Sequence, residues 1–123
     1  MIGKAYWATF QYFDSKAHKM AFKKRPVLVI GDADKKDRIV LPISRVTRKE
    51  NLDPDYDFEL NILKYPKLSL KETSYVRTHK QTVLNEGEIS NCIIDFKKEY
   101  EAAYIEIMAL VEEFQKNLIK KAL

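Results

Sequence analysis

Three consecutive cations, Lys23-Lys24-Arg25, directly precede a proline and an apolar run. Pro26 fixes φ and cannot continue a helix, while residues 27–30 are apolar and mostly β-branched, which predicts a strand buried on both faces. The guanidinium of Arg25 is permanently charged, and its planar fork matches a phosphate group bidentately. Arg25 is therefore either a phosphate-binding residue held on a rigid strand or a charged gatekeeper beside an apolar strand.

A second polar cluster follows the apolar run of residues 38–44. Ser44 ends this run, and Arg45, Thr47 and Arg48 come directly after it. A hydroxyl among cations is suited to contacting a phosphate. The alternative is that Ser44 caps the local backbone of a turn.

Residues 11–24 show no clear period and are predicted to form a long loop between two strands. The segment carries four lysines, one histidine, and the aromatic residues Phe13 and Phe22 near Met20. Cations interleaved with aromatic rings suit single-stranded RNA, whose phosphates meet lysines and whose bases stack on rings. The alternative is a solvated loop with Phe13 and Phe22 anchored in the core.

Composition limits the classes of protein that fit this chain of 123 residues. Residues 1–50 contain twelve Lys and Arg against five Asp and Glu, whereas residues 51–123 contain ten against thirteen. A basic N-terminal half favours a polyanionic partner, with nucleic acid first, although a solvated surface has the same composition. No apolar run approaches the ~20 residues of a membrane-spanning helix.

The N-terminus and the cysteine content indicate the compartment. Lys4 and polar residues interrupt any signal-peptide core, and the single cysteine, Cys92, has no partner for an internal disulfide. We therefore expect a cytoplasmic protein. With no histidine near it in the sequence, Cys92 is expected to be a buried structural thiol.

The predicted elements make an α+β protein that is mainly β. Further strands are expected at residues 3–10 and 56–62, with one or two more at 73–84. Trp7 is expected to pack in the core, and Pro42 implies an edge strand or a bulge. His79 has the pKa of a general acid or base, but a lone histidine in a strand is more commonly structural.

The pattern changes to helix from about Asp95 to Lys121. The apolar residues of one stripe are spaced 4-3-4-3-4, and they are Tyr100, Tyr104, Ile107, Val111, Phe114 and Leu118. Ile105, Met108 and Ala109 are predicted to widen this face. Residues 1–92 are expected to form a small barrel, and residues 93–123 an amphipathic helix that packs on the same domain or extends from it.

The chain resembles the MazF/PemK family of toxin endoribonucleases of type II toxin–antitoxin systems. The resemblance begins with the glycine and aromatic-tryptophan strand at residues 3–10 and continues with the arginine-proline-valine-leucine-valine strand at residues 24–30. A hydrophobic strand closed by serine follows at residues 39–44. A weaker likeness, to a later serine-valine strand, lies at Ser74-Tyr75-Val76 and Gln81. Two features depart from the family: Ser44 replaces the commoner threonine, and the C-terminal helix is longer.

This resemblance implies an SH3-like barrel, usually homodimeric, that cleaves single-stranded mRNA at specific sequences without a metal or other cofactor. It implies attack by the ribose 2′-OH, with 2′,3′-cyclic phosphate and 5′-OH products, and a cognate antitoxin protein that covers the RNA site. Arg25 and Ser44 are the implied catalytic pair. The residues expected to contact RNA are Lys16, His18, Lys19, Lys23, Lys24, Arg45, Thr47, Arg77, Thr78 and His79.

Two other functions fit the same sequence. The barrel is then a protein-binding module, comparable to the related gyrase-poisoning toxins, or a catalytically silent scaffold that works through its long helix. The presence of both Arg25 and Ser44 favours the nuclease, and an RNA cleavage assay distinguishes the three.

Overall fold

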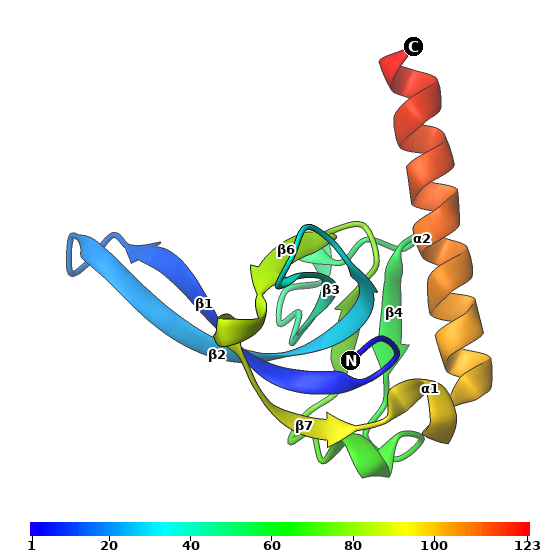
Figure 1. Ribbon diagram of the computed structural model, residues 1–123, viewed down its shortest axis with the longest axis horizontal. Coiled ribbons are helices and arrows are strands. Elements are labelled where there is room, and N and C mark those ends of the chain that lie inside the picture. Colours follow the sequence, from blue (N-terminus) through cyan, green and yellow to red (C-terminus); the bar gives the residue numbers. More distant parts are fainter.

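The computed structural model describes all residues from 1 to 123 as an α+β protein, mainly β, with a long C-terminal helix (Figure 1). All strand pairings are antiparallel, and the sheet is curled. The strands are β1 (Ala5–Asp14), β2 (Lys19–Asp32), β3 (Asp37–Ser44), β4 (Asp57–Leu60), β5 (Ser74–Arg77), β6 (Thr82–Asn85) and β7 (Ile89–Ile94). Short 3₁₀ turns occupy Lys49–Asn51, Pro66–Leu68 and Glu86–Glu88.

The strands follow the order β4-β5-β3-β2-β1-β7, and β6 pairs with β3 beside β5. β3 therefore lies inside the sheet, although Pro42 predicted an edge or a bulge. The neighbour of β3 changes from β6, which pairs as far as Val40, to β5, which pairs from Ile43. Pro42 lies in this gap, where a residue without a backbone N–H is tolerated.

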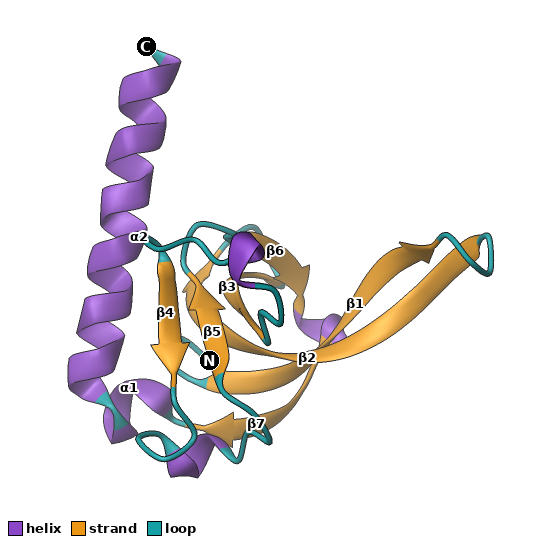
Figure 2. Ribbon diagram, turned by 180° about the vertical axis from the view of Figure 1, so that it is seen from behind, coloured by secondary structure: helices purple, strands orange, loops and turns teal.

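β1 and β2 form the longest hairpin, whose outer half projects from the body of the molecule as an arm (Figure 1, left; Figure 2, right). The prediction of a loop over residues 11–24 was wrong, because most of these residues belong to β1 and β2. The arm has no buried face, so its sequence lacks the alternation of apolar and polar residues that identifies a half-buried strand. Phe13 and Phe22 are exposed rather than anchored in the core.

The base of β2 is buried on both faces, as predicted. Leu28 points into a larger apolar cluster, whereas its neighbours Val27 and Val29 point into a smaller one. Side chains alternate between the two faces of a strand, so each cluster receives every second residue of β2. The strand that carries Arg25 is thus fixed from both sides.

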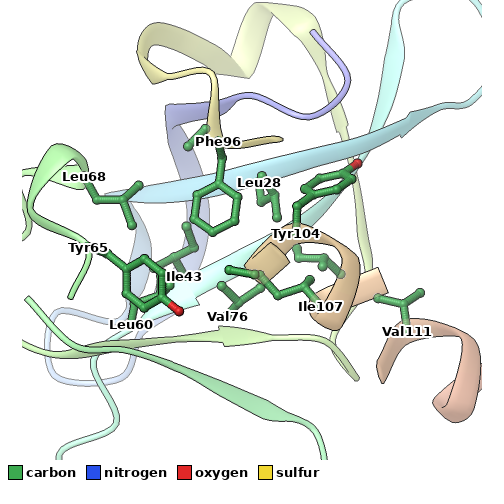
Figure 3. Close-up of a cluster of buried hydrophobic side chains, with 13 residues drawn as sticks. Leu28, Ile43, Leu60, Tyr65, Leu68, Val76, Phe96, Tyr104, Ile107 and Val111 are labelled. Atoms are coloured by element: carbon green, nitrogen blue, oxygen red, sulfur yellow. The ribbon is translucent and has the colours of Figure 1, made fainter. Parts of the chain in front are cut away.

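The C-terminal helix contributes to the larger cluster. Tyr104, Ile107 and Val111 lie against sheet residues such as Leu28 and Val76 (Figure 3). The helical region consists of α1 (Phe96–Glu99) and α2 (Glu101–Ala122), separated at Tyr100. Neither helix combines the length and the hydropathy that a membrane-spanning helix requires.

The apolar stripe of the helix was predicted correctly near the sheet but not at its end. Leu118 lies on the same stripe but is half exposed, because α2 extends past the sheet (Figure 2). Ile105 and Ala109 do not widen the packed face, since both are exposed on the opposite side.

Two further expectations were wrong. Trp7 is 41% exposed and does not belong to either core cluster. Cys92 is also exposed, and it lies in β7, an edge strand of the sheet that the sequence pattern did not reveal. Gly3 has a φ of +87°, and its carbonyl accepts a hydrogen bond from Lys97, so α1 approaches the start of β1 closely. A Cβ at Gly3 would lie 2.9 Å from the Cβ of Lys97.

Candidate nucleic-acid interface

Arg25 and Ser44 meet where β2 leaves the body of the sheet. The β2–β3 register pairs Val27 with Pro42. Because the strands are antiparallel, Arg25, two residues before Val27, lies opposite Ser44, two residues after Pro42. Nη1 of Arg25 donates a hydrogen bond to Oγ of Ser44 over 3.0 Å. This is the one side-chain hydrogen bond of Arg25, so the other four guanidinium N–H groups and the Ser44 hydroxyl proton remain available to a ligand.

The charge of Arg25 is not balanced by a carboxylate. Arg25 is partly buried, yet it forms no ion pair. The positive charge of Arg25 lowers the pKa of the neighbouring Lys23 ammonium, and partial burial and Arg45 lower that pKa further. A group of cations that raise one another's free energy is stabilised by a bound anion.

These residues line a first cleft of about 530 Å³. Its walls come from the base of the arm, the end of β3 and residues 69–74, and Trp7 contributes an exposed indole. Five cations line it, and they are Lys23, Lys24, Arg25, Arg45 and Lys71. The only carboxylate is Glu72, which pairs with Arg45 over 3.3 Å.

A second cleft of about 570 Å³ lies on the other side of Arg25. Phe10 and Tyr12 of β1 line it on one side, and Lys80 lines it from the segment before β6. Lys23 and Arg25 line both clefts, so these two cations form the boundary between them. The second cleft contains no carboxylate.

The structure brings six of the predicted site residues to the clefts. Arg25, Ser44, Lys23, Lys24, Arg45 and Thr47 all line the first cleft. The aromatic walls were missed, since Phe10 and Tyr12 share a face with Arg25 only through the β1–β2 register. Residues 69–74 were missed as well, because no sequence signal links them to β2 across forty residues.

Lys16, His18 and Lys19 lie at the tip of the arm and line neither cleft. The Asp14 carboxylate accepts hydrogen bonds from the backbone N–H groups of Lys16 and Ala17, and it thereby closes the turn. His18 takes the left-handed conformation, with a φ of 52°. The tip therefore presents its cations to solvent on an ordered turn.

Arg77, Thr78 and His79 lie at the end of β5 and just after it, and they line neither cleft. Nε and Nη2 of Arg77 donate to the two carboxylate oxygens of Asp57 over 3.0 and 3.2 Å. The hydroxyl of Thr78 donates to the carbonyl of Tyr56. These contacts join β4, β5 and the segments next to them, and they occupy the groups that were expected to contact RNA.

His79 packs between Tyr56 and Phe114, with ring centroids 6.1 and 6.3 Å from its own. Its Nδ1 is buried, has no hydrogen-bond partner, and lies 3.9 Å from the Asp57 carboxylate. Burial lowers the pKa of His79 below 6.5, and this outweighs the opposing effect of Asp57. His79 is therefore a neutral packing residue near pH 7.

No group of three or more His, Cys, Asp or Glu side chains is arranged to hold a metal ion. No protein-family model matches this sequence, and no curated protein matches it significantly. The likeness to the MazF/PemK toxins is therefore carried by the short motifs of residues 3–44 and the weaker likeness at residues 74–81.

Proposed function

We propose that this chain is a metal-independent endoribonuclease with an SH3-like barrel, acting as the toxin of a toxin–antitoxin pair. The observation that carries the proposal is the hydrogen bond between Arg25 and Ser44 in a cleft lined by five cations. A guanidinium without a carboxylate partner and a hydroxyl with a free proton form a site for one phosphate group.

A single RNA strand fits across the two clefts. The phosphate that is cleaved lies on Arg25, at the boundary that both clefts share. The neighbouring nucleotides then extend in opposite directions, one towards Trp7 and the other towards Phe10 and Tyr12. Aromatic rings accept unpaired bases by stacking, and duplex RNA cannot present its bases in this way.

Cleavage proceeds by attack of the ribose 2′-oxygen on the adjacent phosphorus. The P–O2′ bond forms, the P–O5′ bond breaks, and the products are a 2′,3′-cyclic phosphate and a 5′-OH end. Water takes the proton of the 2′-OH and supplies one to the leaving oxygen. Arg25 stabilises the charge that builds on the non-bridging oxygens, and Ser44 donates a hydrogen bond that orients the phosphate.

The same cleft is the surface on which an antitoxin would act. Five cations against one carboxylate favour an acidic polypeptide segment over a neutral one. Such a segment would occupy the position of the RNA backbone and would inhibit the enzyme by competition. Titration with RNA should then displace it in a salt-dependent manner.

The test is cleavage of a long single-stranded RNA in EDTA, with the ends mapped. Arg25→Ala should lower the rate at least about 100-fold, the usual effect of removing one transition-state donor. Ser44→Ala should lower it about tenfold. Arg48→Ala removes the same charge from an exposed residue outside both clefts and should leave the rate unchanged.

Each result decides something. Discrete cuts with 5′-OH ends from the wild type, lost in Arg25→Ala, support the nuclease and reveal its recognition sequence. Wild-type rates in a folded Arg25→Ala protein would remove Arg25 from the mechanism. No cuts from folded wild-type protein would overturn the enzyme and favour a protein-binding module.

A further inference from the structure

The segment of residues 79–82, here named the strap, lies between α2 and the second cleft. Its side chains face the two sides alternately. His79 packs against an aromatic ring of α2, and the Gln81 amide oxygen accepts a hydrogen bond from a glutamine of α2 over 3.2 Å. Lys80 and Thr82 instead line the second cleft. α2 therefore holds one side of the strap, and the other side is a wall of the cleft.

The backbone of Lys80 is hydrogen-bonded on both sides. Its N–H donates to the carbonyl of Arg77 over 3.0 Å, and its carbonyl accepts from the hydroxyl of Thr82 over 3.0 Å. The Lys80 side chain is exposed and forms no ion pair. The strap thus presents an unpaired ammonium from an ordered backbone, and a group that is ordered in advance loses less entropy when it binds a ligand.

Lys80 is the one cation of the second cleft that does not also line the first. Lys23 and Arg25 line both clefts, and in the proposed complex they lie next to the cleaved phosphate. The nucleotide that enters the second cleft stacks its base on Phe10 or Tyr12. A stacked base still exposes its edges, so the Lys80 ammonium can donate hydrogen bonds to the base itself.

The chemistry of the second cleft favours one base. An ammonium only donates hydrogen bonds, and the cleft has no carboxylate or side-chain amide that could accept from an amino group; its side-chain acceptors are the hydroxyls of Tyr12 and Thr82. Adenine and cytosine place an amino group beside their ring acceptors, and uracil places N3–H between its two carbonyls. Guanine presents two adjacent acceptors, O6 and N7, on the edge that arginine and lysine most commonly read.

We propose that Lys80 selects guanine for the nucleotide that occupies the second cleft, by donating hydrogen bonds to O6 and N7. This proposal rests on the proposed function, because it takes single-stranded RNA as the ligand. Thr82 and Gln81 are positioning residues, since they fix the strap and do not read the base. Because the second cleft adjoins Arg25, the guanine occupies a fixed position directly beside the cleaved phosphate.

Mapping the ends of RNA cleaved by the wild type and by Lys80→Gln tests the proposal. Wild-type cuts should have guanine at one fixed position beside the cut, preferred about tenfold or more over the other bases. The amide in Lys80→Gln both donates and accepts, so this variant should shift the preference to adenine, whose N6 and N7 glutamine reads. Lys71→Gln, the same change in the first cleft, should slow cleavage of all sequences alike and keep the guanine preference.

Base analogues test which edge of guanine is read. In a short RNA with a single cleavage site, inosine lacks only the 2-amino group of guanine and should be cleaved at the same rate. 7-Deazaguanine lacks N7 and should be cleaved several-fold more slowly by the wild type, whereas Lys80→Ala should cleave it and guanine alike. Equal wild-type cleavage of guanine and 7-deazaguanine, or a loss with inosine, would overturn the proposed contact.

Nucleotide binding separates this proposal from the proposed nuclease. In titrations followed by NMR, GMP should shift the amide signals of Lys80 and Thr82 at concentrations about tenfold lower than AMP does, and Lys80→Ala should bind the two nucleotides equally. Preferential GMP binding without RNA cleavage would overturn the nuclease and support the guanine site. Discrete RNA cuts with no guanine preference, together with equal binding of GMP and AMP, would support the nuclease and overturn the guanine site.

Discussion

Replacing Arg77 by alanine should cause a large loss of stability and leave the cleft intact. The Asp57 carboxylate is fully buried, and Arg77 is the only cation that donates hydrogen bonds to it. Nη2 of Arg77 also donates to the carbonyl of Asn51 over 2.9 Å. The variant therefore leaves the buried Asp57 carboxylate without a cationic partner. It also removes the hydrogen bond to Asn51, which lies far from Arg77 in the sequence.

The expected magnitude follows from the burial of the pair. Removing one partner of a buried ion pair costs about 3–5 kcal/mol, since the remaining charge has lost both its partner and its water. For a chain of 123 residues this corresponds to a melting temperature lower by about 10–20 °C. The Arg45–Glu72 pair is an internal control, because both side chains are about 60% exposed. Arg45→Ala should change stability by at most about 1 kcal/mol.

Urea denaturation followed by circular dichroism measures both variants. The double variant Arg77→Met with Asp57→Asn removes both charges, while the amide oxygen can still accept the hydrogen bond of the Asp53 N–H. It should recover most of the loss in Arg77→Ala, and such non-additivity is the signature of a coupled pair. Equal destabilisation by Arg77→Ala and Arg45→Ala would refute the reasoning. RNA cleavage by Arg77→Ala, measured well below its melting temperature, should remain near the wild-type rate.

Three further predictions concern the environments of single side chains. Burial lowers the pKa of His79 in the folded chain, so the unfolded chain binds a proton at this residue at a higher pH than the folded chain does. The free energy of unfolding should therefore fall as the pH drops below about 6.5, and it should level off below the pKa of the folded state. His79→Leu should flatten this part of the pH profile, measured by urea denaturation. Trp7 is the only tryptophan and lies in the first cleft, so bound RNA should quench the intrinsic fluorescence, and a signal indifferent to RNA would contradict the site. Ile107→Ala in the core should lower the free energy of unfolding by about 2–5 kcal/mol, whereas Val83→Ala at an exposed position should change it by less than about 0.5 kcal/mol.

The sequence predicted those elements whose burial leaves a pattern. The bases of β2 and β3 are apolar runs, and the core-facing stripe of α2 has a helical period, so all three were found. The arm and β7 were missed because most of their side chains are exposed, and burial is what selects apolar residues at alternating positions. The break between α1 and α2 at Tyr100 was also missed, because Tyr100 falls on the predicted apolar stripe and so looks helical in the sequence.

The sequence predicted only the part of the candidate site that two consecutive strands bring together. Arg25 and Ser44 each stand at the end of a recognisable strand, and antiparallel pairing of consecutive strands brings such ends together. Arg77 shows the opposite case. A cation among hydroxyls has the same local sequence whether it binds RNA or a buried carboxylate, and here the carboxylate is Asp57, twenty residues earlier. The sequence identifies the charge but not the partner.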